Sequence, residues 1–117
     1  MGAHQQARRE IESLAAEIAP LIVQTALPSL KQKYDAGARE PSTVATLDSS
    51  VGVRVLDQAG DDLELGDEIF LIVHEKAVST LMTQLGQGCH NVTIYRHGSH
   101  PFRRGEDLQF DVRAFFS

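Results

Sequence analysis

The residues best suited to chemistry lie between Tyr95 and Gly105, a polar stretch rich in arginine and histidine. Arginine presents a planar fork of donors that fits phosphate and carboxylate groups, and glycines allow backbone amides to approach an anion. Five residues form this candidate anion site: Arg96, His97, His100, Arg103 and Arg104. The alternative interpretation is a solvated loop whose arginines pair with acidic residues of the same chain or of another subunit.

Residues of metal-binding type also gather here, because Cys89, His90, His97 and His100 fall within twelve positions. The spacing of His97 and His100 suits zinc, and Cys89 is a third candidate ligand. However, Cys89 and His90 are adjacent, so they would point to opposite faces of a strand, and no second cysteine completes the set. We therefore predict no metal and no cofactor, with Cys89 acting as a small apolar core residue.

The sequence offers little basis for an enzyme. Cys89 would need a histidine base, and His74 is the candidate by position, but no oxyanion-hole signal accompanies the pair. Common catalytic and nucleotide-binding fingerprints do not occur. The acidic residues between Asp57 and Glu68 lack the spacing of a calcium loop and are typical of a solvated edge. These observations favour a non-enzymatic protein.

Composition indicates one globular domain over residues 1–117, in which residues 1–4 are interpreted as cloning residue or a disordered start. The chain is 42% hydrophobic and 23% charged, which is ordinary for a globular fold. A net charge of -5 disfavours nucleic-acid binding. The single cysteine fits a reducing compartment, and no signal peptide or long apolar run is visible, so we expect a cytoplasmic protein without a membrane partner.

The element expected to organise the chain is the apolar run at residues 65–73. It is opened by a turn signal and dominated by β-branched and aromatic residues, which is typical of a strand buried on both faces. We expect further strands at residues 43–47 and 51–57, and a helix at residues 75–85. In this interpretation residues 65–73 form the central strand of the sheet.

Residues 96–105, which we call the basic connection, would join the two strands of a C-terminal hairpin. Apolar and polar residues alternate over residues 92–95 and again over residues 108–116, which predicts strands with one wet face. A shift of 39 residues also superimposes residues 53–73 on residues 92–112, and this echo could reflect chance or an internal duplication.

The opening segment, residues 5–34, has the apolar spacing of a long helix that is kinked or divided near Pro20. Its stripe is wide, so one small sheet would leave part of it uncovered. Five residues form the expected interface with a second copy: Ile11, Leu14, Ile18, Leu21 and Ile22. Packing of the helix against the sheet of its own chain is the favoured interpretation, and a second copy would bury the remainder of the stripe.

The stretch LELGDEIFLIVHEKAVSTL, residues 63–81, resembles the end of the C-terminal regulatory domains of TrkA-type potassium-uptake proteins. In that family a Leu-x-x-Gly-Asp turn opens a strand and a helix follows. The resemblance covers about a sixth of the chain and implies the same strand and helix here. No family function is carried over from it.

Together these patterns predict an α+β fold, with an antiparallel or mixed sheet of four to five strands packed against a long kinked N-terminal helix and a second central helix. The favoured function is a self-associating protein-interaction or assembly module, and a structural component of a larger particle, such as a phage assembly, fits equally well. A protein partner other than itself is also compatible. The alternative is a sensory or regulatory domain that binds a small anion through residues 96–104.

Overall fold

The computed structural model describes the chain at residues 2–60, 62–98 and 103–117. The described elements are, in chain order, α1 (Gly2–Asp35), β1 (Ser42–Leu47), α2 (Ser49–Ala59), α3 (Leu63–Leu85), β2 (Cys89–His97) and β3 (Leu108–Phe116). The protein is α+β, as predicted. Within the described ranges its sheet has three strands rather than four or five, because two of the expected strands are helical.

The sheet is antiparallel throughout, with strand order β1-β3-β2. The last strand in sequence is therefore the central one: Leu108 lies opposite Leu47 of β1, and Gln109 lies opposite His97 of β2. Every second residue of β3 is buried, from Leu108 to Phe116, and this confirms the alternation predicted for the C-terminal hairpin. The register of β2 shifts between Cys89 and Asn91, which indicates a bulge.

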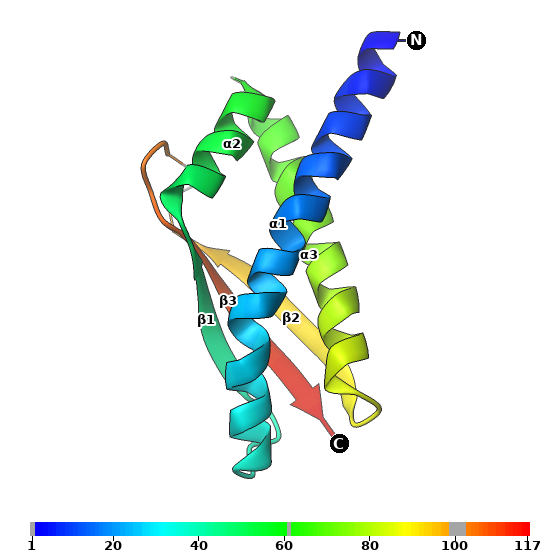
Figure 1. Cartoon of the computed structure of the whole chain (residues 1–117), viewed down its shortest axis with the longest axis vertical. Helices are drawn as coiled ribbons and strands as arrows, with labels where there is room; N and C mark the ends of the chain where they lie inside the picture. Colours follow the sequence, from blue (N-terminus) through cyan, green and yellow to red (C-terminus); the bar gives the residue numbers. More distant parts are fainter. Residues whose placement is uncertain (1, 61, 99–102) are drawn as a thin grey trace.

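Two helices cover one face of the sheet. α1 and α3 lie side by side, with α1 over β1 and α3 over β2 (Figure 1). α1 is one continuous helix that includes both Pro20 and Pro28. The ring of Tyr34, at its C-terminal end, stacks on Phe116 at 4.1 Å between ring centroids, which ties the end of α1 to the end of the central strand.

The prediction of a central strand at residues 65–73 was wrong, because this run lies inside α3. Four side chains of α3 are fully buried and recur at every fourth position, Ile69, Val73, Ala77 and Leu81, whereas Leu71 is 57% exposed. A strand buried on both faces would have hidden Leu71, but a helix turns it to solvent. The Asp62 carboxylate accepts a hydrogen bond from the Leu65 amide at 3.1 Å and caps the helix, so the apparent turn is a helix start.

The prediction of a strand at residues 51–57 was also wrong. This segment belongs to α2, which buries Gly52, Val55 and Ala59 on one side. Asp48 caps its first turn by accepting from the Ser50 amide at 2.8 Å, and this contact lowers the pKa of the Asp48 carboxyl. The alternation of Val51, Val53 and Val55 therefore does not mark a strand.

These corrections remove the basis for the 39-residue echo. Residues 53–73 fall in α2 and α3, whereas residues 92–112 lie largely in the two strands of the hairpin, so the superimposed segments do not share a structure. The strand implied by the TrkA-type resemblance is likewise absent, because residues 63–81 are continuously helical.

One helical segment within the described residues, Arg8–Asp35, is long and apolar enough by length and composition to cross a membrane. Of its most apolar window, 44% is buried inside the folded chain, and both the core helix of a soluble protein and a signal sequence near the N-terminus pass the same test. The sequence showed no apolar run of this length because Pro20, Thr25 and Pro28 interrupt the apolar residues. In this fold the segment packs on α3 and β1.

Candidate functional site

Three described residues of the predicted anion site, Arg96, His97 and Arg104, contact different parts of the fold. Arg96 extends over the Phe70 ring, with its guanidinium carbon 5.1 Å from the ring centroid, on the side of the sheet that the helices cover. The next residue, His97, contacts Asp111 at 3.3 Å on the opposite side. Arg104 reaches Asp57 of α2 at 2.7 Å. Adjacent strand residues point to opposite faces, so Arg96 and His97 cannot clamp one ligand.

Two members of that site remain, Arg103 and His100. The Arg103 amide donates to the Glu106 carboxylate at 3.4 Å, which closes a turn in the connection. His100 lies outside the described residues. The Arg104 contact matches the alternative interpretation, in which arginines of the basic connection pair with acidic residues of the same chain.

His74 of α3 is a half-buried residue that sequence analysis named only as a conceivable base. Its ring meets the Phe110 ring edge-on at 5.6 Å between centroids, and its buried Nε2 has no hydrogen-bond partner among the residues that the structure describes. Burial lowers the pKa of His74, and the nearby positive charge of Arg96 lowers it further. The neutral imidazole is thus the form that the fold favours.

Cys89 is buried, and its Sγ lies 3.4 Å from the Asn91 carbonyl oxygen across the bulge of β2. His90, in contrast, is exposed beside Phe115, at 6.4 Å between ring centroids. In the part of the chain that the structure describes, no three side chains of the His, Cys, Asp and Glu types are grouped as metal ligands.

The expected interface on α1 is mostly internal. Four of its five members, Ile11, Leu14, Ile18 and Ile22, are at most 6% exposed in the single chain, whereas Leu21 is 36% exposed. They pack in the core against α3 and the sheet. The stripe is covered by its own fold because α3, unforeseen at this length, supplies a second packing surface.

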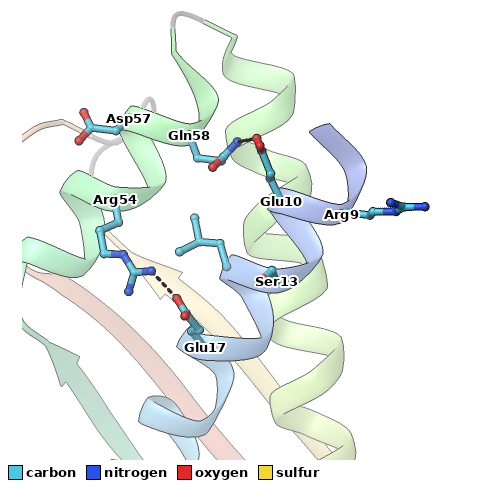
Figure 2. Close-up of a pocket in the computed structure, with 8 residues that line it drawn as sticks. Arg9, Glu10, Ser13, Glu17, Arg54, Asp57 and Gln58 are labelled. Atoms are coloured by element: carbon cyan, nitrogen blue, oxygen red, sulfur yellow. Dashed lines mark hydrogen bonds and ion pairs between the residues drawn. The ribbon is translucent and has the colours of Figure 1, made fainter. Parts of the chain in front are cut away.

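A hollow of about 770 Å³ lies between α1 and α2, but its polar groups are already matched (Figure 2). Arg54 of α2 forms an ion pair with Glu17 of α1, and Gln58 donates to the Glu10 carboxylate at 3.0 Å. Arg9 points away from the hollow. These contacts join the two helices, so we assign no ligand to this cleft.

The most informative surface is the side of the sheet turned away from α1 and α3, which we call the open face. It comprises the outward side chains of the three strands: Ser42, Val44, Thr46, Thr93, Tyr95, His97, Gln109, Asp111, Arg113 and Phe115. A hollow of about 690 Å³ lies on it, lined in part by Val44, Tyr95 and Phe115. Val44 is 50% exposed and Tyr95 is 66% exposed.

Charged groups lie among these apolar side chains. Asp111 and Arg113 project from the central strand, and both line the hollow. Lys33 of α1 reaches the rim, where its Nζ donates to the Ser42 carbonyl oxygen at 2.6 Å. Asp111 contacts His97, while Arg113 forms no ion pair with any described residue. The open face thus combines apolar area with one exposed cation that has no ion-pair partner among the described residues.

Both outer edges of the sheet are also unpaired in the single chain. β1 and β2 each bond only to β3, so each has one row of backbone groups without a strand neighbour among the described elements. Unpaired edges are places where another strand can add. The sequence predicted one wet face for the two strands of the C-terminal hairpin, and β2 and β3 have it. The free edges of the sheet were not predicted, because the wrong central strand at residues 65–73 gave a different strand order.

Searches of protein-family models, of curated proteins and of solved structures found no match to this chain. The likeness of residues 63–81 to TrkA-type proteins therefore has no support beyond the letters themselves. Any function for this chain has to be argued from its own surface.

Proposed function

We propose that this protein is a non-enzymatic assembly module that forms homo-oligomers through the open face of its sheet. The observation that carries the proposal is the gathering of Val44, Tyr95 and Phe115 around one hollow on an uncovered face. An antiparallel sheet often has one solvated face, but such a face is normally polar. Exposed aromatic and aliphatic residues gathered around one hollow mark interaction sites more often than scattered single residues do.

Self-association of this kind suits a repeated component of a larger particle, such as a phage assembly. The open face would supply one contact between copies, and the free edges of β1 and β2 would supply others. The alternative of an anion-binding regulatory domain draws less support, since Arg96 and Arg104 are engaged with Phe70 and Asp57.

The test is the molar mass of the purified chain across a concentration series, by light scattering and analytical ultracentrifugation. We expect dimers or larger species, and we expect Val44→Glu to weaken association by about tenfold or more, since a buried unpaired charge is costly. The matched control is Leu71→Glu, because Leu71 is comparably exposed but lies on α3. A monomer at every concentration, or equal effects of the two variants, would refute the proposal.

A further inference from the structure

The arrangement of charge on the central strand suggests how two copies meet. Asp111 and Arg113 are separated by one inward residue, Val112, and both belong to the open face. An acid and a base two positions apart are about 7 Å apart along a strand. A strand with this pattern is complementary to a second copy of itself running in the opposite direction.

Two symmetric arrangements place one open face on another with the strands of both copies aligned. In the first, a two-fold axis runs across the strands beside Val112, so that β3 of each copy faces β3 of the other in the opposite direction and Asp111 meets Arg113. In the second, the axis runs along β3, so that Asp111 meets Asp111 and Arg113 meets Arg113. Like charges held face to face in an interface cost several kcal/mol. Charge therefore selects the first arrangement.

The neighbours of the two charged residues fit the same arrangement by size. Val44 and Tyr95 lie beside Asp111 in the rows of the sheet, and the smaller Ser42 and Thr93 lie beside Arg113. When the row of Asp111 faces the row of Arg113, each large side chain stands over a small one. Packed sheets lie about 10 Å apart with interdigitating side chains, which requires such alternation.

We propose that a second copy of this chain packs on the open face around a two-fold axis across the strands, with Asp111 of each copy paired to Arg113 of the partner subunit. This inference rests on the proposed self-association and specifies its geometry. The apolar side chains supply most of the affinity, and the reciprocal ion pairs set the orientation.

Charge reversal tests the geometry. Arg113→Asp and Asp111→Arg should each raise the dimer dissociation constant by about tenfold or more, because each places like charges opposite one another. The double variant D111R/R113D restores opposite charges across the axis and should return the constant to within about threefold of the original. Sedimentation equilibrium at low salt measures all four proteins, because screening weakens exposed ion pairs.

The control is Lys31→Asp, which changes the net charge by the same amount as Arg113→Asp but at an exposed position of α1. It should leave the dissociation constant unchanged, and circular dichroism should show every variant folded. Dimers that persist unchanged in both single variants would overturn the face-to-face geometry while leaving self-association intact, as edge pairing would predict. A double variant as weak as the single ones would also overturn it, whereas a monomeric original protein would refute the proposed function itself.

Discussion

At the scale of single residues, His74 shows how the fold fixes a protonation state. The ring lies against Phe110, its Nε2 is buried, and Arg96 adds positive charge nearby. Burial, and then the charge of Arg96, disfavour the imidazolium, so the pKa of His74 is lower in the folded chain than in the unfolded chain. The unfolded chain therefore binds the extra proton more readily as the pH falls.

We expect folding stability to decline as the pH falls below about 6.5, the ordinary histidine value, and through the lowered pKa of His74. The lowered pKa of Asp48 has the same sign but acts only below its ordinary value of 3.8, so the two effects occupy separate ranges. Thermal melting between pH 7.5 and pH 5 measures the first. His74→Phe keeps an apolar ring in place and should flatten the decline in that range, and an unchanged slope would contradict the assignment.

At this scale the sequence correctly predicted which side chains of β3 face the core. Phe110, Val112 and Ala114 were expected on one face and are buried there. It failed for Arg96 and His97, which are neighbours in the chain but serve opposite faces of β2. A group of ligand-type letters does not form a site unless the backbone turns them toward one point.

At the scale of elements, caps decide where the helices begin. The acidic residues from Asp57 to Glu68 were interpreted as a solvated edge, yet Asp62 and Glu64 lie where a helix start favours negative charge. The β-branched residues in the first half of α3 favoured a strand in the sequence-based interpretation, although Ile69, Val73 and Ala77 are spaced four residues apart, as in a helix. The spacing was visible, but it was divided between two predicted elements.

Asp62→Ala should destabilise the protein by about 1 kcal/mol, because it removes the acceptor for the Leu65 amide at the start of α3. Chemical denaturation measures the loss. Asp62→Asn retains an acceptor and should cost much less. If the two variants unfold at the same denaturant concentration, the cap does not contribute as described.

At the scale of the whole molecule, α1 supplies one of the two helices that cover the sheet. Nine of its apolar side chains are buried: Ile11, Leu14, Ala15, Ile18, Ala19, Ile22, Val23, Ala26 and Leu30. The sequence predicted this helix and its stripe well. Its partner surface could not be predicted, because α3 was not recognised as a long helix and the strand count was therefore too high.

Removal of residues 1–36 should abolish cooperative unfolding, because the apolar faces of α3 and β1 would lose their cover. Calorimetry of the truncated chain should show no thermal transition, and a fluorescent dye that binds exposed apolar surface should brighten. Retention of a sharp transition would show that α1 is dispensable for the core. Interfaces should accordingly be tested with point variants of the full chain.

The strand order also has a consequence for synthesis. β3 joins β1 to β2, yet it follows both of them in the chain. As the polypeptide leaves the ribosome, neither earlier strand has a ladder partner until residues 108–116 emerge, although both helices of the covering layer are already made. The nascent chain thus passes through a stage with helices and no sheet, in which chaperones would find bare apolar surface to hold.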